Sequence, residues 1–327
     1  MQDEKLELTQ EWDKTFEKSM QVDHKKVTFH NRFGITLAAD LYKPKGATGP
    51  FAALAVSGPF GAVKEQASGL YAQTLAERGF LTLAFDPSYT GESGGMPRRV
   101  SSPDINTEDF CAAVDYLSCC DDVDPERIGI VGICGWGGIA LNAAAIDPRI
   151  KATVASTSYV MTRVAGKGYF DAEDSADARM AARRAMSAQR TEDYRTGTYK
   201  RAGGVVDPLP EDAPQFVKDY YDYYKTPRGY HERSGNSTDG WNVTSNTSWL
   251  NTNLLQYAHE IENAVLVVHG ENAHSLYMGE DAYKLLRGEN KKLLVVPGAS
   301  HCDLYDGGGK NAIPFDAIDA FFDTYLV

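Results

Sequence analysis

The chain has 327 residues, of which 43% are hydrophobic, and its formal net charge at pH 7 is −12. A chain of this length and composition can bury a sizeable core without disulfides or metals, and it fits one large domain with an inserted cap better than two independent units. The sequence contains no basic stripe, zinc-finger spacing or aromatic ribonucleoprotein motif, so nucleic acid is not an expected partner.

The cysteine pattern and the N-terminal sequence point to a soluble cytoplasmic protein. Five cysteines are an odd number for a disulfide framework, and the adjacent Cys119 and Cys120 lack a metal-binding spacing, so neither a metal nor an organic cofactor is expected. The first twenty residues are charged throughout and lack the apolar core of a signal peptide. No run reaches the roughly 18 apolar residues of a membrane span, so no membrane partner is expected.

The predicted elements begin with an extension of about 25 residues that is helical or loosely attached. Residues 26–44 then alternate apolar and polar side chains around a turn, which predicts an antiparallel hairpin. Six short, nearly continuous apolar runs follow, and such runs are typical of strands covered on both faces. They occupy residues 51–59, 80–87, 127–134, 150–157, 263–270 and 292–299.

Helical patterns fall between these runs, at residues 65–79, 106–120, 137–147, 279–288 and 314–326. The alternation predicts an α/β fold in which a mostly parallel central sheet carries helices on both faces.

One long segment, residues 159–257, interrupts this alternation. It contains one helix candidate, residues 172–190, and a stretch rich in aromatic and turn-forming residues. Nearly one hundred residues between adjacent strands is too long for a plain connection. We therefore expect a helical or irregular cap over a core formed by residues 1–158 and 258–327. Its aromatic side chains are expected to line or cover an apolar pocket, namely Tyr220, Tyr221, Tyr223, Tyr224, Trp241 and Trp249.

Three chemically suggestive residues each follow a predicted strand: Cys134, Glu271 and His301. Ligands of open α/β sheets bind at the carboxyl ends of strands, and the order nucleophile, acid, histidine is that of the α/β-hydrolase sheet. The cysteine would attack, the imidazole would take its proton, and the carboxylate would orient the imidazole. The helix N-terminus after Cys134 is expected to favour the thiolate.

An oxyanion hole and a pocket wall complete the predicted site. The backbone N–H of Gly135 and that of Phe60 or Gly61, in the loop after the first core strand, are placed to hold an oxyanion. Trp136, Tyr159 and His274 are the expected pocket residues. Asp86 is expected to tie down its loop by hydrogen bonds, and Lys64 and Glu65 are expected to pair near the oxyanion loop.

The motif "GICGWGG" resembles the G-x-C-x-G-G elbow of the dienelactone hydrolases. The strings "VKEQASGLYAQTLAERGFLTLAFDPSYTGESGG", "GENAHSLYMGEDAY" and "VPGASHCDLYD" resemble a bacterial and fungal hydrolase family related to the polyketide transferases. The resemblance spans about residues 25–327 and implies an α/β-hydrolase fold, but no particular substrate.

Two positions depart from the usual hydrolase pattern. The elbow carries Trp136 where a small residue is usual, so either the helix begins one residue later or, as we favour, the indole faces the pocket. The position three residues after Gly270, where an acid is common, holds Ala273. Glu271 is the nearest carboxylate, and Asp239 or no carboxylate at all are the alternatives.

These observations predict a cysteine-nucleophile hydrolase that acts on a small ester, lactone or thioester through a thioacyl-enzyme intermediate. Acyl transfer from the same site, a peptidase of the same fold, and an inactive ligand-binding protein are the competing hypotheses. The expected partner is a small-molecule acyl substrate, and the sequence leaves a homo-oligomer open.

Overall fold

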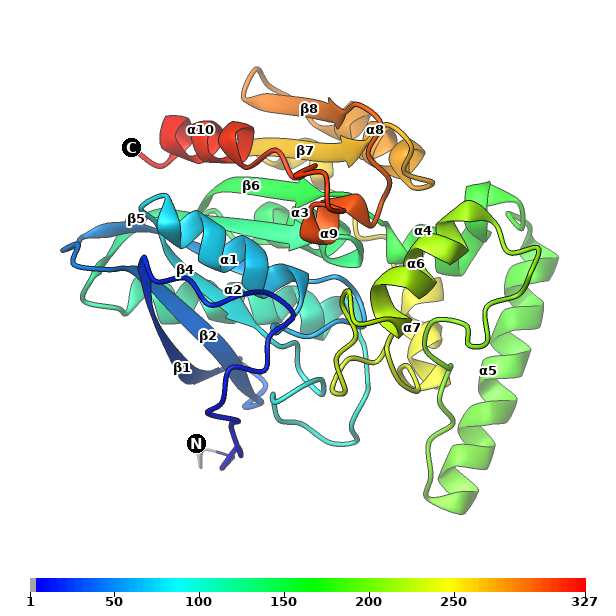
Figure 1. Cartoon of the computed structure of the whole chain (residues 1–327). Coiled ribbons are helices and arrows are strands. Elements are labelled where there is room, and N and C mark those ends of the chain that lie inside the picture. The colour runs from blue at the N-terminus through cyan, green and yellow to red at the C-terminus, as the bar shows by residue number, and fades with distance from the viewer. Residues whose placement is uncertain (1–3) are drawn as a thin grey trace.

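The computed structural model describes residues 4–327 and contains an eight-stranded sheet with the order β1-β2-β4-β3-β5-β6-β7-β8 (Figure 1). Strand β2 pairs antiparallel with β1 and β4, and all other neighbouring strands are parallel. The mostly parallel sheet and its N-terminal hairpin confirm the prediction. The strands are β1 (Val22–His30), β2 (Thr36–Pro44), β3 (Phe51–Ser57), β4 (Leu81–Phe85), β5 (Val123–Ile133), β6 (Ile150–Ser156), β7 (Ala264–Gly270) and β8 (Lys291–Val296).

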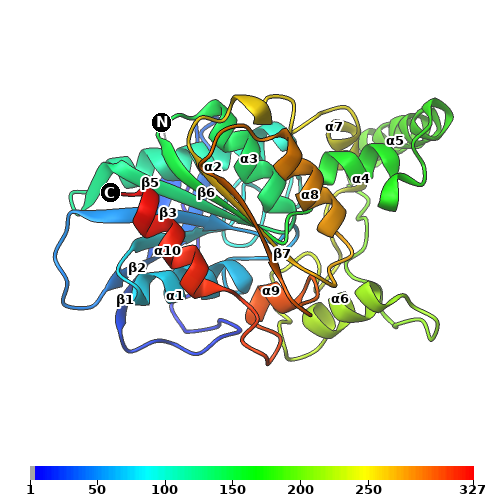
Figure 2. The same ribbon diagram turned by 90° about the horizontal axis from the view of Figure 1, so that it is seen from above.

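Helices cover both faces of the sheet, as Figure 2 shows. Helices α1 (Ala67–Glu77) and α10 (Phe315–Tyr325) cover one face, and α2 (Pro103–Ser118), α3 (Gly135–Ile146) and α8 (Leu276–Leu285) cover the other. The two cores divide the side chains of each strand between them: in β3, Leu54 and Val56 pack toward α1, whereas Ala53 and Ala55 pack toward α2 and α3. This is the alternation of a strand buried on both sides, and it explains why the apolar runs are continuous.

The N-terminal extension is neither helical nor loose, contrary to the prediction. Between Glu4 and the start of β1 the chain forms no helix or strand, yet it is held to the core along its length. The backbone N–H of Thr15 donates to the carbonyl of Glu65 at 2.9 Å, and the ammonium of Lys14 contacts Asp40 at 2.6 Å. Both side chains of the Lys14–Asp40 pair are fully buried, so this extension is part of the packed structure.

The segment between β6 and β7 adds no strand to the sheet and lies beyond its carboxyl edge (Figure 1). We call residues 159–257 the lid segment. It contains α4 (Met161–Lys167), η1 (Tyr169–Asp171), α5 (Ala176–Thr196), α6 (Gln215–Lys225), η2 (Val243–Ser245) and α7 (Asn246–Leu250), and η3 (Ala258–Glu260) follows it.

Helix α6 was not predicted, although its tyrosines carried a usable signal. Tyr220, Tyr223 and Tyr224 are spaced i, i+3 and i+4, so they lie on one helix face, and Tyr223 and Tyr224 are fully buried. None of the described helices has both the length and the apolar character needed to cross a lipid bilayer.

Candidate active site

Cys134 occupies a sharp turn between β5 and α3. Its backbone has φ 59° and ψ −123°, an uncommon conformation for a residue with a side chain. Three backbone hydrogen bonds hold it: the Cys134 N–H donates to Ser156 at 2.9 Å, and its carbonyl accepts from Gly137 at 2.9 Å and Tyr159 at 2.8 Å. The strand-to-helix turn therefore fixes the thiol at the carboxyl edge of the sheet, with 6% of the residue exposed.

Trp136 is not a wall of the cavity that Cys134 faces, which corrects the prediction. Helix α3 begins at Gly135, so Trp136 lies in its first turn, and its indole packs edge-on against Phe85 and Phe110 at centroid distances of 5.6 and 5.2 Å. The residue is 1% exposed. Gly58 provides the space, because a Cβ atom there would lie 2.8 Å from the Cβ of Trp136. Gly58 on the facing loop thus provides the room that a small residue at position 136 usually provides in this elbow.

His301 is buried and is held by hydroxyl groups on both ring nitrogens. Its Nδ1 lies 2.7 Å from the Oγ of Ser275 and 3.0 Å from the Oγ1 of Thr157. Its Nε2 lies 3.0 Å from the hydroxyl of Tyr305, one helical turn further along the chain. The Thr157 hydroxyl also donates to the His301 carbonyl at 3.3 Å. With that proton engaged, Thr157 can accept an N–H from Nδ1, which leaves Nε2 as the basic nitrogen.

Neither predicted carboxylate reaches His301. The exposed side chain of Glu271 accepts from the backbone N–H of Gly298 at 2.8 Å. Asp239 pairs instead with Arg201 at 3.2 Å and Arg99 at 3.7 Å. Within residues 4–327 no carboxylate forms a hydrogen bond or ion pair with the imidazole, so hydroxyl groups stand where a triad acid was expected. Sequence reasoning missed Ser275, Thr157 and Tyr305.

Burial sets the protonation states of the site. It lowers the pKa of His301 well below the ordinary value, and neighbouring His274 and His269 act in the same direction. Burial also raises the pKa of the Cys134 thiol, which outweighs the opposing effect of four hydrogen-bond donors. The resting pair is therefore a neutral thiol and a neutral imidazole, and the effect of burial on the thiol outweighs the groups that favour the thiolate.

Four groups act to lower the pKa of the Cys134 thiol against the effect of burial: the Tyr305 and Tyr220 hydroxyls and the backbone N–H groups of Gly135 and Phe60. Each favours the thiolate over the thiol. The two backbone groups are the pair that the sequence predicted for an oxyanion hole, with Phe60 supplying the loop donor. The Tyr305 hydroxyl lies 3.0 Å from Nε2 of His301, the base candidate, and Tyr305 lines the same cavity as Cys134, the nucleophile candidate.

The lid segment holds the loop that carries Phe60. Asn236 Nδ2 donates to the Phe60 carbonyl at 2.7 Å, and the Asn236 N–H donates to the Gly61 carbonyl at 3.0 Å. Ser234 adds a third bond to Gly61 at 2.9 Å. Gly61 has φ +78°, and a Cβ there would lie 2.4 Å from Asn236 Oδ1. Gly61 therefore shapes the turn, and Asn236 fixes the direction of the Phe60 peptide.

A cavity of about 300 Å³ opens beside the Cys134 thiol. Three of its lining residues belong to the core, namely Phe60, Cys134 and Tyr305. The others belong to the lid segment: Tyr159, Met161, Tyr169, Gly204, Val205, Val206, Phe216, Val217, Tyr220, Asn236 and Trp241.

His274 lies behind this cavity and is not one of its lining residues. Its ring stacks on Phe216 at 4.6 Å, with an interplanar angle of 19°, and lies 5.0 Å from the ring of His301. Burial lowers the pKa of His274 to about 4, so its ring is neutral and packs as an aromatic group. Tyr159, in contrast, does lie in the cavity wall.

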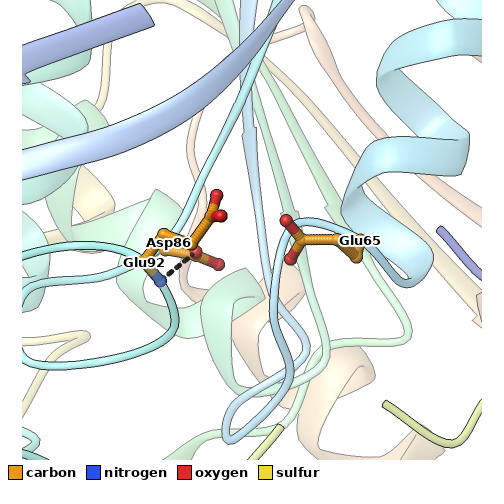
Figure 3. A group of neighbouring side chains, drawn as sticks. All are labelled: Glu65, Asp86 and Glu92. Atoms are coloured by element: carbon orange, nitrogen blue, oxygen red, sulfur yellow. Dashed lines mark hydrogen bonds between the residues drawn. The ribbon is translucent and has the colours of Figure 1, made fainter. Parts of the chain in front are cut away.

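A buried charge cluster lies next in the chain to the loop that carries Phe60, and none of its residues lines the cavity. Figure 3 shows the carboxylates of Glu65, Asp86 and Glu92, whose oxygen atoms lie within 4.8 Å of one another. The fully buried ammonium of Lys64 contacts these three residues at 2.7, 2.8 and 2.6 Å, so it occupies the position of a cation between them. Asp86 also accepts from the Lys64 backbone N–H at 2.8 Å. The predicted Lys64–Glu65 pair and the loop-fastening role of Asp86 are confirmed.

The fold and its similarity to known proteins identify the class of this protein. The parallel sheet, the elbow after β5 and the histidine after β8 are those of an α/β hydrolase. The structure resembles the α/β hydrolase GrgF of Penicillium sp. sh18, with a TM-score of 0.77 at 20% identity over 93% of this chain and 99% of that one. The chain belongs to the X-Pro dipeptidyl-peptidase (S15) family, whose profile matches residues 34–303. It is therefore a hydrolase of this fold.

The chain is also similar to individual proteins. The chain is 56% identical to the uncharacterized protein PA2218 of Pseudomonas aeruginosa over 98% of this chain and 86% of that protein. The crystal structure of PA2218 superimposes with a TM-score of 0.95 over 98% of this chain and 99% of that one. The thiohydrolase aneE of Aspergillus aculeatus is 37% identical over 39% of each chain.

Proposed function

We propose that this hydrolase cleaves a small ester, lactone or thioester through a thioacyl-enzyme intermediate on Cys134. The observation that carries the proposal is the position of Tyr305: its hydroxyl lies 3.0 Å from His301 Nε2, and Tyr305 lines the same cavity as Cys134, whose thiol pKa it acts to lower. This position suits a hydroxyl that passes a proton between a nucleophile and a base at the carboxyl edge of the sheet.

The first half-reaction begins from the neutral thiol and imidazole. As the sulfur attacks the substrate carbonyl carbon, the thiol proton passes to the Tyr305 oxygen and the phenol proton passes to His301 Nε2. The carbonyl oxygen becomes an oxyanion that the N–H groups of Phe60 and Gly135 stabilise. When the intermediate collapses, the bond to the leaving group breaks, and the leaving oxygen or sulfur takes the proton back from the imidazolium.

The second half-reaction releases the acyl group. A water molecule attacks the thioester carbonyl while His301 Nε2 accepts a water proton, and the Cys134 sulfur leaves and is protonated again. Attack by an alcohol or amine in place of water would be acyl transfer from the same intermediate, so the two reactions differ only in the acceptor. The name of the fungal relative aneE, a thiohydrolase, supports a thioester as one substrate type.

Hydroxyl partners on Nδ1 suit a base that cycles without a standing positive charge. Ser275 and Thr157 orient the ring and fix its tautomer, but neither neutralises an imidazolium as a carboxylate would. Proton transfer is therefore expected to accompany the attack of the sulfur.

The family description also raises a dipeptidyl-peptidase as a candidate. Such an enzyme must hold the charged amino terminus of a peptide close to the nucleophile, and a buried ammonium requires a paired partner. No Asp or Glu is among the residues that line the cavity beside Cys134. The lining therefore favours a neutral acyl substrate over a peptide amino terminus.

The test compares wild type, Cys134→Ala and Cys134→Ser on a panel of matched esters and thioesters, with circular dichroism as the check on folding. The proposal expects both variants to fold and Cys134→Ala to lose turnover to the background rate. Retained turnover in a folded Cys134→Ala protein would remove Cys134 as the nucleophile. Unchanged turnover in Cys134→Ser with no effect of His301→Ala would remove the proposed proton path.

A further inference from the structure

The cavity beside Cys134 carries no charged side chain. Its lining residues include no Asp, Glu, Lys, Arg or His, and its walls are formed by aromatic, aliphatic and glycine residues together with Asn236. Because nearly all of the lining comes from the lid segment, the core supplies the reacting groups and the lid supplies the surface that contacts the acyl group.

The polar groups of the cavity are neutral, and two of them are engaged with protein partners. The Tyr305 hydroxyl lies 3.0 Å from His301 Nε2, and the amide nitrogen of Asn236 donates to the Phe60 carbonyl. The buried indole N–H of Trp241 has no partner within the described residues and is a neutral donor. A ligand therefore finds neutral donors but no cation among the lining residues that could replace the hydration shell of an anion.

An anionic acyl group would consequently lose its hydration on entry without gaining a partner. Burying an unpaired charge is far more costly than burying a neutral polar group, because the charge must be desolvated or neutralised.

We propose that the acyl group of the substrate is uncharged and largely apolar, and that the lid excludes acyl groups carrying a carboxylate or phosphate. The inference rests on the proposed function, since Cys134 as nucleophile places the acyl group in this cavity. The inference restricts only the acyl group of the substrate and leaves the leaving group open. Val206, which is 41% exposed, shows that part of the lining faces solvent, where a polar leaving group can remain hydrated.

The test measures binding to the Cys134→Ala protein, which cannot form the thioacyl intermediate. Isothermal titration at pH 7.5 compares 3-(4-carbamoylphenyl)propanamide with isosteric 3-(4-carboxyphenyl)propanamide, whose ring carboxylate is ionised at that pH and lies at the far end of the acyl group. The proposal expects the amide to bind roughly 10- to 100-fold more tightly than the carboxylate, the range that corresponds to leaving a buried charged group unpaired. Equal affinity, tighter binding of the carboxylate, or no binding of either ligand would overturn it.

A charge placed in the wall tests the cause of the selectivity. Val217→Lys on α6 should reduce or reverse the preference for the amide, whereas Gln215→Lys, on the same helix but outside the lining, should leave it unchanged. Val206→Lys at the exposed part of the lining replaces Val217→Lys if that protein does not fold. An unchanged preference in a folded lysine variant of the lining overturns the assignment of this cavity.

The two proposals fail in different ways. If Cys134→Ala keeps its turnover in the kinetic assay, the proposed function fails, while the amide-to-carboxylate binding ratio is still measured in the same variant. If the kinetics depend on Cys134 but the binding ratio is near one, the charge selectivity alone is wrong.

Discussion

Removal of the two hydroxyl groups on His301 Nδ1 tests how this site replaces a triad acid. Ser275→Ala and Thr157→Val delete the contacts at 2.7 and 3.0 Å while largely preserving the size of each side chain. Both residues are fully buried, so water does not readily take the place of the lost hydroxyl. The expected result is a loss of ring orientation and of the correct tautomer.

The magnitude follows from the absence of charge on these partners. A neutral hydrogen bond contributes about 1 kcal/mol, which corresponds to a loss of about fivefold in kcat/KM for each variant and about 30-fold for the double variant if the effects add. Loss of the correct carboxylate partner in a serine-protease triad lowers kcat by roughly 10⁴-fold. The two arrangements therefore predict effects that differ by more than two orders of magnitude.

The assay is kcat/KM for a neutral activated ester, measured for each variant and for the pair. Glu271→Gln is the control for the acid that the sequence predicted, and it should change kcat/KM by less than about twofold, because its side chain bonds to Gly298. Ser158→Ala removes a buried hydroxyl without a partner in the described chain and is the matched structural control. A loss of 10³-fold or more in Glu271→Gln, or no loss in the double variant, would refute the reasoning.

Three further predictions concern the proton path and the buried charges. Tyr305→Phe should lower kcat by about 10²-fold or more, the scale of one lost proton-transfer group, whereas Tyr224→Phe nearby should not; equal rates in both would exclude the relay. Lys64→Met should lower the free energy of unfolding in urea by about 3–5 kcal/mol, because three carboxylates lose their buried cation, and a change below about 1 kcal/mol would contradict this. Charge interactions with Lys64, together with hydrogen bonds from Lys26 and Lys64, overcome the opposing effect of burial and lower the pKa of Glu92 to about 2. The ionised Glu92 carboxylate thus stabilises the folded protein above pH 4.5, and this contribution is lost as the pH falls through about 2. Glu92→Gln should therefore make the free energy of unfolding depend less on pH over that interval, and an unchanged pH dependence would count against this prediction.

The fold and two parts of the site followed from local sequence patterns. The parallel strands are nearly continuous apolar runs, so the sequence predicts the order of strands and helices; Cys134 directly follows β5, and His301 lies in the turn after β8. Residues that follow parallel strands meet at one edge of the sheet whatever the details of packing. This is why the chain order alone brought the two residues to the same region.

The rest of the site depended on contacts between distant segments. Glu271 was chosen by its position after β7, but its side chain direction is set by the turn at Gly298. Trp136 was assigned to the pocket because small residues are usual there, and the space that Gly58 provides cannot be seen in the elbow motif itself. Tyr305, like the tyrosines of α6, carried a usable signal, since it follows His301 by four residues and residues with this spacing on a helical turn share a face.

The most direct test of the central claim is to trap the acyl-enzyme. The protein is mixed rapidly with the p-nitrophenyl ester of 3-phenylpropanoic acid, quenched with acid, and examined by intact mass and peptide mapping. The account predicts one added acyl group on Cys134 in the wild type, and greatly slowed acylation in His301→Ala. Acylation at another residue would contradict the claim. Turnover that persists in Cys134→Ala, with no acyl adduct in the wild type, would also contradict it.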